Sequence, residues 1–223
     1  MPADTPSRTD KTKPAKLTAR KQPTQLRSRA KVETILKTTR DILINEGLEK
    51  LTTNRVAQLS GMSVGSLYQY FPNKLAILSE LYSRWLEEVR LGLQQMAAPV
   101  QTIDDGEKEQ QLWQAVDSLY NYEQLDAVQL KLESELVKAT ELYTELKELD
   151  SKHGLQIAEI IADLLQPFNP AKARPELIQL GKYIYATHTC MDNFVLKQPE
   201  PPQTYMEMHK YAIYSLICQS CLN

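Results

Sequence analysis

The stretch SGMSVGSLYQYFPNK, Ser60–Lys74, decides the fold because it is unusual within an otherwise helical region. It places two of the seven glycines of the chain and three serines beside two tyrosines. Small and hydroxyl-bearing side chains bury little apolar surface and make a weak core. We therefore expect this stretch to contact something outside the protein.

Two short helices joined by a tight turn are predicted around Gly61. The first follows LTTNRVAQLSG, residues 51–61, with Thr52 or Thr53 as its N-cap. Gly61 supplies the positive φ that the turn needs, and Ser63 caps the second helix. The residues of the first helix expected to face inward are Val56, Ala57 and Leu59.

The second short helix has two distinct faces. Val64, Leu67 and Phe71 are spaced at i, i+3 and i+7 and form an inward stripe. The opposite face carries Gly65, Ser66 and Gln69, with Tyr68 and Tyr70 flanking it. The predicted outward face is shallow, uncharged and rich in hydrogen-bonding groups.

Longer helices flank this pair. The segment that starts near Ser28 carries one apolar face, and Gly47 follows it as a left-handed C-cap. The stripe of that face is Val32, Ile35, Leu36, Thr39, Ile42 and Leu43. Pro72 ends the second short helix, and Asn73 caps a long helix over residues 74–96.

Two short helices in this arrangement fit a helix-turn-helix, whose second helix enters the DNA major groove. Gly65 and Ser66 let the helix backbone approach the base edges, and the amide of Gln69 can pair with adenine. At the start of the first helix, Thr53, Asn54 and Arg55 are placed for a phosphate, as is Lys74 at the start of the long helix. A generic helical hairpin with a glycine turn is the alternative.

The charge of the chain is unevenly distributed. Residues 1–74 contain 14 Lys and Arg against 6 Asp and Glu, whereas residues 75–223 contain 12 against 22. A basic segment favours a polyanionic partner, although it is also compatible with a solvated tail.

Composition divides the chain into three parts. Residues 1–26 are rich in Pro, Thr, Lys and Arg and are expected to form a disordered basic arm. This arm either adds salt-sensitive DNA affinity, reaches a minor groove, or is functionally silent. Residues 27–73 form the predicted DNA-binding domain, and residues 74–223 form a larger helical domain. The fold class is all-α.

The last two predicted helices, within residues 175–196 and 204–222, are apolar nearly all round. Such a helix must be buried on every side, which favours pairing with a second subunit in a four-helix bundle. A central core helix in a monomer is the alternative. Before them, a stripe with spacings of three and four contains Leu125, Val128, Leu132, Leu136, Ala139, Tyr143 and Leu146.

The run LTTNRVAQLSGMSVGSLYQYFPNK, residues 51–74, resembles the DNA-binding signature of the TetR family of bacterial transcriptional regulators. The resemblance covers residues 27–81, and beyond residue 81 it is architectural only. The positions that carry it are Gly47, Thr52, Thr53, Val56, Ala57, Gly61, Ser63, Ser66, Leu67, Tyr68, Tyr70, Phe71 and Lys74. Met62 departs mildly from the pattern, and Gln69 and Tyr70 occupy variable positions.

The resemblance implies a homodimer that binds a palindromic operator and is released by a small ligand in the C-terminal domain. It gives Thr53, Ser66, Tyr68, Tyr70 and Lys74 contacts to phosphates or the groove, with Val64, Gly65 and Gln69 nearest the bases. The predicted DNA-contacting set is Thr53, Asn54, Arg55, Ser63, Val64, Gly65, Ser66, Tyr68, Gln69, Tyr70 and Lys74. A DNA-bound protein that recruits a protein partner instead of a small ligand is the alternative.

Candidate ligand-contacting residues are aromatic or polarisable side chains on the middle helices, and each of them could equally be an ordinary core residue. They are Trp113, Tyr120, Tyr143, His188 and Met191. The effector itself is not identified by the sequence.

One histidine and three cysteines, the ligand set of a structural zinc site, occur near the C-terminal end: His188, Cys190, Cys218 and Cys221. His188 and Cys190, however, point to nearly opposite sides of a helix. We expect no metal and no cofactor, and we expect these cysteines to be inert and buried rather than redox sensors. No catalytic constellation can be assembled from the sequence, so we do not expect an enzyme. Without a secretory signal or a membrane-spanning run, a cytoplasmic location is expected.

Overall fold

The computed structural model describes residues 26–97, 103–104, 106–121, 127–195, 198 and 203–222. The N-terminal helices are α1 (Leu26–Asn45), the 3₁₀ helix η1 (Leu48–Lys50), α2 (Thr53–Leu59), α3 (Val64–Tyr70) and α4 (Lys74–Met96). The remaining helices are α5 (Lys108–Asn121), α6 (Ala127–Leu142), α7 (Thr144–Leu165), the 3₁₀ helix η2 (Gln166–Phe168), α8 (Arg174–Val195) and α9 (Gln203–Cys221). These described residues contain no strand, which confirms the all-α prediction. The predicted arm, apart from Leu26, lies outside the described residues.

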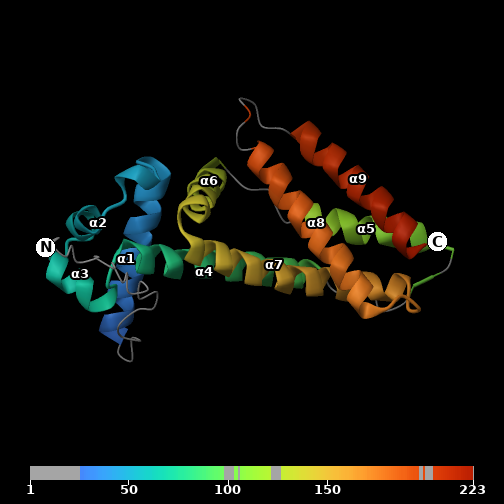
Figure 1. The fold of residues 1–223 in the computed structure, drawn as a ribbon, viewed down its shortest axis with the longest axis horizontal. Helices are drawn as coiled ribbons and strands as arrows, with labels where there is room; N and C mark the ends of the chain where they lie inside the picture. Colours follow the sequence, from blue (N-terminus) through green and yellow to red (C-terminus); the bar gives the residue numbers. More distant parts are fainter. Residues whose placement is uncertain are drawn as a thin grey trace, which may run out of the picture.

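The N-terminal module is α1, α2 and α3, and it lies at one end of an elongated molecule (Figure 1). All six residues of the predicted α1 stripe are buried, from Val32 at 4% to Leu43 at 0% exposed. Gly47 follows α1 with a φ of 85°, and its backbone N–H donates to the carbonyl of Ile42 at 3.0 Å. The predicted apolar face and the predicted cap of α1 are both confirmed.

Helix α4 leads out of the N-terminal module and, with α7, runs along the length of the molecule (Figure 1). Its N-cap is Asn73, whose Oδ1 accepts from the backbone N–H of Ala76 at 2.8 Å. The bounds Lys74–Met96 are those predicted from the sequence. Helices α5, α8 and α9 lie at the other end (Figure 1).

Two hydrophobic cores stabilise the molecule. The first joins α1, α2 and α3 to the first half of α4, to α6 and to Leu146 at the start of α7. The second joins the end of α4 to α5, α7, α8 and α9. The first core therefore extends across the predicted domain boundary after residue 73, and it connects the N-terminal module directly to α6.

The stripe predicted over residues 125–146 is interrupted. Helix α6 ends at Leu142, and Tyr143 takes an extended conformation with φ −126° and ψ 112° before α7 begins. The stripe still supplies core residues on both sides of this break, because Leu136 and Leu146 are each 0% exposed. Val128, by contrast, is 48% exposed, so the stripe was wrong at that position.

Helices α7 and α8 approach closely because two glycines face their contact. A Cβ atom built on Gly181 would lie 2.5 Å from the carbonyl oxygen of Ala158. One built on Gly154 would lie 2.6 Å from the ring of Tyr185. These glycines let the Tyr185 ring lie directly against α7.

Candidate nucleic-acid interface and ligand cavity

The helix-turn-helix geometry is built by side-chain caps and one glycine. The Thr52 hydroxyl caps α2 by accepting from the backbone N–H of Arg55 at 3.1 Å. Gly61 turns the chain with a φ of 67°, and the Ser63 hydroxyl caps α3 by accepting from the backbone N–H of Ser66 at 3.1 Å. The two helices are also linked by a hydrogen bond of 3.2 Å between the hydroxyls of Thr53 and Tyr68. The predicted turn and caps are thus present.

The outward face of α3 is formed by Gly65, Tyr68 and Gln69, all of which are exposed. A Cβ atom on Gly65 would meet no atom within 4 Å, so this side of the helix is open. Asn54 on α2 and Ser63 before α3 are exposed as well, whereas Thr53 and Ser66 are half-buried. The uncharged, hydrogen-bonding surface expected from the sequence is present on α3.

Two side chains lie differently from their prediction, and a third has the inward position that its stripe predicted. Tyr70, expected beside the outward face, is only 9% exposed and belongs to the first core, although it is the last residue of α3. Leu59, expected to face inward, is 49% exposed because α2 ends at this residue. Val64 is half-buried and packs against the first core, which confirms its place in the inward stripe, and its position nearest the bases stays a prediction.

Arg55 is directed toward α1 rather than along the outward face. Its guanidinium donates to both carboxylate oxygens of Glu46, at 2.8 and 3.1 Å, and to the side chain of Gln58 at 3.2 Å. The hydrogen bond from Arg55 lowers the pKa of Glu46. This placement assigns Arg55 to holding α2 against the end of α1, a role that the sequence reasoning missed.

Lys74 connects the N-terminal module to the helices behind it. The side chain is half-buried, and its Nζ lies 5.7 Å from the centroid of the Tyr143 ring. A cation over an aromatic face is attracted by the ring quadrupole. Tyr143, a predicted ligand contact, is therefore a partner of Lys74 in this structure.

A cavity of about 370 Å³ lies between the N-terminal module and the helices behind it. Residues of α1, α4, α6, α7 and α8 line it. None of the five predicted ligand contacts is among these residues. The position of the cavity shows that a ligand bound there would touch α1, α4 and α6 together.

The five predicted contacts lie elsewhere in the helical domain. Trp113 packs between Tyr211 and Tyr214, with ring centroids 5.1 and 4.8 Å away. Tyr120 and His188 form an aromatic group with His209, in which the two imidazoles are stacked at 5.8 Å. Met191 is half-buried on α8. Trp113, Tyr120, Tyr143 and His188 make aromatic or cation–π contacts here, and a ligand contact at any of the five stays a prediction.

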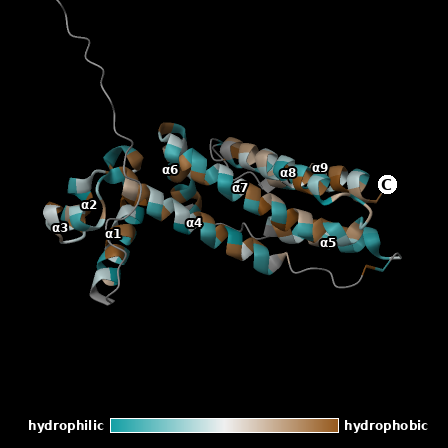
Figure 2. Ribbon diagram, turned by 60° about the horizontal axis from the view of Figure 1, so that its bottom comes forward, coloured by the Kyte–Doolittle hydropathy of each residue, from teal (hydrophilic) through white to brown (hydrophobic). Residues whose placement is uncertain are grey.

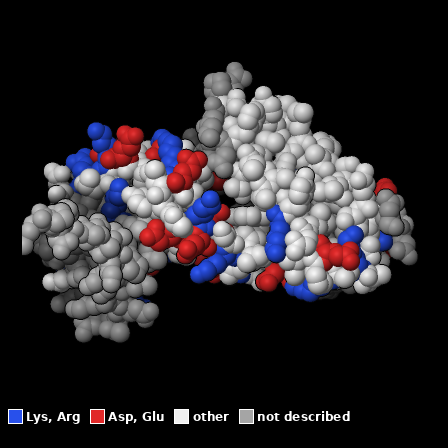
Figure 3. Space-filling model, viewed as in Figure 1, with Lys and Arg blue, Asp and Glu red and all other residues white. Residues whose placement is uncertain are grey.

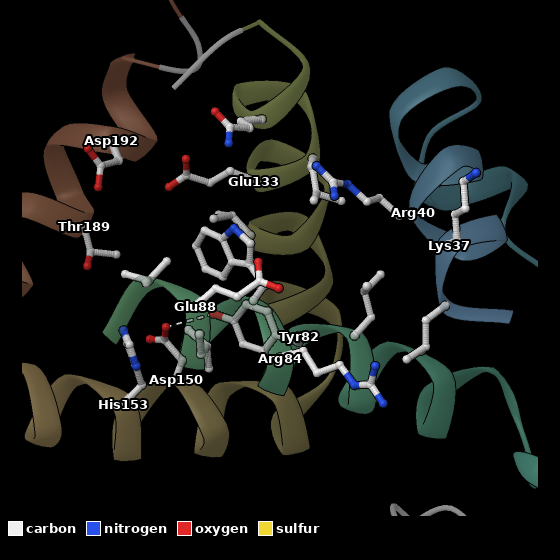
Figure 4. Close-up of a pocket in the computed structure, with 18 of the residues that line it drawn as sticks. Lys37, Arg40, Tyr82, Arg84, Glu88, Glu133, Asp150, His153, Thr189 and Asp192 are labelled. Carbon is white, nitrogen blue, oxygen red and sulfur yellow. Dashed lines mark hydrogen bonds between the residues drawn. The ribbon is translucent and has the colours of Figure 1, made fainter. Parts of the chain in front are cut away.

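Asp150 is the centre of a polar network in the cavity wall. Its Oδ1 accepts a hydrogen bond from the hydroxyl of Tyr82 at 2.9 Å (Figure 4). The same oxygen accepts a second hydrogen bond, from the hydroxyl of Tyr185 at 3.1 Å. Burial, followed by the charge of Asp150, raises the pKa of both tyrosines well above its usual range. Both phenols therefore stay protonated and keep donating to Asp150.

His153 lies next to this network on the same helix. It is 4% exposed, and burial lowers the pKa of its imidazole despite the nearby charge of Asp150. The ring therefore adds no positive charge to the cavity at neutral pH. The sequence reasoning missed Asp150, Tyr82, Tyr185 and His153 because they come from three helices with no shared spacing.

Among the residues that the structure describes, no group of three or more His, Cys, Asp or Glu side chains could hold a metal ion. Cys190 is exposed, Cys218 is half-buried and Cys221 is buried, so the expectation that all three are buried was wrong for Cys190. None of the helices in the described ranges has the length and apolar character that a membrane-spanning segment needs.

Residues 35–81 match the family described as "Bacterial regulatory proteins, tetR family". The chain is also similar in structure to Salmonella enterica GusR, with a TM-score of 0.62 at 16% identity, covering 87% of this chain and 96% of that one. A TetR-family transcriptional regulator from Streptomyces coelicolor gives a TM-score of 0.58 at 17% identity, covering 87% and 99%. The multidrug binding protein EbrR, solved with imidazole, gives 0.58 at 15% identity, covering 83% and 94%.

A search of curated protein sequences finds no match. At these identities the structural neighbours establish the fold, and the family match runs from residue 35 within α1, through α2 and α3, to the start of α4.

Proposed function

Because its N-terminal module is a TetR-family DNA-binding module on the fold of TetR-family regulators, we propose that this protein is a ligand-released repressor of transcription. The observation that carries this proposal is the open, uncharged face of α3, where Gly65, Tyr68 and Gln69 are exposed. The helix enters the major groove by this face, with Gln69 at the bases. Thr53, Asn54, Ser63, Ser66 and Lys74 contact phosphates around it.

The protein acts as a homodimer on an inverted repeat. Large apolar side chains are exposed along α8 and α9, among them Tyr183, Phe194, Met208 and Tyr211, at 55, 45, 64 and 58%. Figure 3 shows that the surface over these helices carries few charged side chains, and Figure 2 shows hydrophobic residues along both. Exposed apolar surface of this kind marks an interaction site. Pairing of α8 and α9 with their copies places two α3 helices on one face of DNA.

A small ligand in the cavity releases the dimer from its operator. The cavity walls include α1 of the N-terminal module and α4, which leads out of that module. A ligand that fits only one position of α4 favours one spacing of the two α3 helices. To shift the equilibrium, the ligand needs only to bind the released conformation more tightly than the DNA-binding one. The cavity supports release by a small molecule rather than recruitment of a protein partner. The protein works in the cytoplasm, where its operator DNA is.

A charge placed on α3 tests this proposal. Gly65→Glu should reduce affinity for duplex DNA by tenfold or more, because a carboxylate on this face repels phosphates, on the order of 1 kcal/mol or more at close range. The fold should persist, since the added side chain enters open space. DNA affinity is measured by fluorescence anisotropy, and helical content by circular dichroism.

The matched control is Gln110→Glu, which adds the same charge at an exposed site on α5, far from α3 (Figure 1). This variant should bind DNA like the wild-type protein. If Gly65→Glu also kept full affinity while folded, α3 would not be the DNA-contacting element.

A further inference from the structure

Two neighbouring side chains of α7 bring polar groups to the cavity wall. Asp150 and His153 both line the cavity and lie three positions apart, so they share one face of the helix. Figure 4 shows them side by side on α7. A single small polar group of a ligand can therefore reach both.

Asp150 is held in place with one carboxylate oxygen committed. The hydroxyls of Tyr82 and Tyr185 both donate to Oδ1, and the ring of Tyr185 is held against Gly154. Within the described ranges of the chain, Oδ2 accepts no hydrogen bond. A carboxylate only accepts hydrogen bonds. Oδ2 is therefore a preordered acceptor for a donor group of a ligand.

His153 supplies the second polar group. It is 4% exposed, and its ring meets that of Tyr185 edge to face, with centroids 5.9 Å apart. Among the groups that the structure describes, its ring nitrogens have no hydrogen-bond partner. A neutral imidazole carries one N–H donor and one acceptor nitrogen. His153 can therefore donate to an acceptor atom of the same ligand group that donates to Asp150.

Other carboxylates of the cavity wall interact elsewhere in the chain. Asp192 lies 3.8 Å from Nε2 of His188, and Glu88 and Glu133 also take part in interactions within the molecule. The polar groups that remain for a ligand at this part of the wall are those of the two α7 side chains.

The surroundings of these two side chains disfavour a positive charge. Burial lowers the pKa of His153, although the charge of Asp150 acts to raise it. At this depth, the cost of desolvating a cation thus exceeds its attraction to Asp150. A neutral polar group is desolvated at lower cost than a charged one. The site therefore suits a neutral group.

The rest of the cavity wall is largely apolar and aromatic. Leu36, Leu86 and Leu132 belong to the first core and also line the cavity. The rings of Tyr82 and Trp85 are stacked with centroids 5.8 Å apart. These side chains suit the apolar body of a small organic molecule.

We propose that the cavity binds a neutral organic molecule with an apolar body and a hydroxyl group, which donates to Oδ2 of Asp150 and accepts from the imidazole of His153. A hydroxyl fits because it is both a donor and an acceptor. The volume of about 370 Å³ suits such a molecule. The inference rests on the proposed function only in making this molecule the effector, and its binding is measured without DNA.

The test compares three probes that share a phenyl ring and a four-carbon chain. They are 4-phenylbutan-1-ol, its methyl ether and 4-phenylbutylammonium, titrated into the full-length protein by calorimetry. The ether cannot donate a hydrogen bond, and the ammonium cannot accept one. The alcohol should bind more tightly than the ammonium, and at least about tenfold more tightly than the ether, which loses the hydrogen bond to a carboxylate. Equal or tighter binding of the ether or the ammonium, or no binding of any probe, would overturn the inference.

Asp150→Asn locates the donor preference. The two tyrosine hydroxyls keep the amide oxygen at the position of Oδ1, so an NH₂ group replaces the acceptor Oδ2. The advantage of the alcohol over the ether should therefore disappear. Glu148→Gln is the matched control, because it removes a carboxylate from an exposed position on the same helix outside the cavity. An advantage that persisted in folded Asp150→Asn would reflect the bulk of the methyl group and overturn the inference.

His153→Leu tests the second contact and leaves Asp150 with its tyrosines intact, so it serves even if Asp150→Asn does not fold. The affinities for the alcohol and the ether should both fall by roughly fivefold, because both oxygens accept from the imidazole. His153→Gln supplies an amide N–H and should recover affinity. Full alcohol affinity in His153→Leu, or an equal loss in His153→Gln, would overturn the role of His153.

The outcomes separate this inference from the proposed function. Gly65→Glu should bind the alcohol like the wild-type protein, because Gly65 is not part of the cavity. Selective alcohol binding by a protein that selects no DNA would contradict the proposed function only. Normal DNA selection without a preference for the alcohol would contradict the hydroxyl ligand only.

Discussion

Gln69 and Lys74 are both predicted to contact DNA, but the structure gives them different surroundings. Gln69 is exposed on α3, where its amide can reach a base edge. Lys74 begins α4 and is half-buried, with its ammonium near the ring of Tyr143. A point charge at that position can bind a phosphate but cannot read a base. The two residues should therefore contribute differently to DNA binding.

Gln69→Ala should change the preference for one base pair by about 1–3 kcal/mol and have little effect on other positions. Lys74→Ala should weaken binding to all sequences alike. It should also reduce the slope of the logarithm of the binding constant against the logarithm of the salt concentration by about 1. Affinities for a set of single-base operator variants at several salt concentrations measure both effects. Equal losses on all sequences from both substitutions would refute this division of labour.

At the scale of elements, Glu135 joins α6 to the N-terminal module. It is 3% exposed and accepts from the backbone N–H of Leu48 in η1 at 2.8 Å. Lys131 and Lys138 also donate to it, at 2.9 and 2.7 Å. Burial opposes ionisation of Glu135, but the hydrogen bonds from Lys138, Leu48 and Lys131 outweigh it and lower its pKa to about 2. A wall of the cavity is thus tied to the N-terminal module by one ionised carboxylate.

Glu135→Gln should lower the free energy of unfolding at pH 7 by about 1–2 kcal/mol, because charged hydrogen bonds become neutral ones. A carboxylate with a lowered folded-state pKa stabilises the fold above its unfolded value of 4.5. That stability is lost as the pH falls toward about 2, so the difference between variant and wild type should shrink across this window.

Urea unfolding from pH 7 to pH 2 measures this difference. Glu141→Gln, on the exposed side of the same helix, is the control and should match the wild-type protein at each pH. A constant difference between Glu135→Gln and the wild type over the whole range would contradict the role of the ionised carboxylate.

The helices could be predicted from the sequence where spacing and capping agree. Local chemistry predicts the buried face of α1, the bounds of α4, and the N-caps Thr52, Ser63 and Asn73. The burial of Tyr70 could not be predicted, because it depends on the first core, which several helices build together.

The cavity could not be predicted either, because its walls come from five helices that only the tertiary fold brings together. Asp150 gives no signal in the sequence, since its partners Tyr82 and Tyr185 lie 68 and 35 positions away. The prediction of Trp113 and Tyr120 as ligand contacts rests on their aromatic side chains. Aromatic side chains occur both in cavity walls and in packed cores, so the residue type alone does not distinguish the two.

At the scale of the whole molecule, the exposed apolar side chains of α8 and α9 are the surface proposed for dimerisation. Met208→Glu with Tyr211→Glu should convert the dimer into monomers in sedimentation velocity, because two charges would be buried at the interface without partners. Leu142→Glu is the control, since Leu142 is 69% exposed on α6, away from that surface. A double variant that remained dimeric would place the interface elsewhere.

The central claim is that a dimer of this chain reads DNA through two copies of α3, and selection of bound sequences from random duplex DNA tests it most directly. The account predicts enrichment of an inverted repeat whose half-sites are separated by about one helical turn or slightly more. Failure to enrich any sequence, or enrichment of a motif without two-fold symmetry, would contradict it.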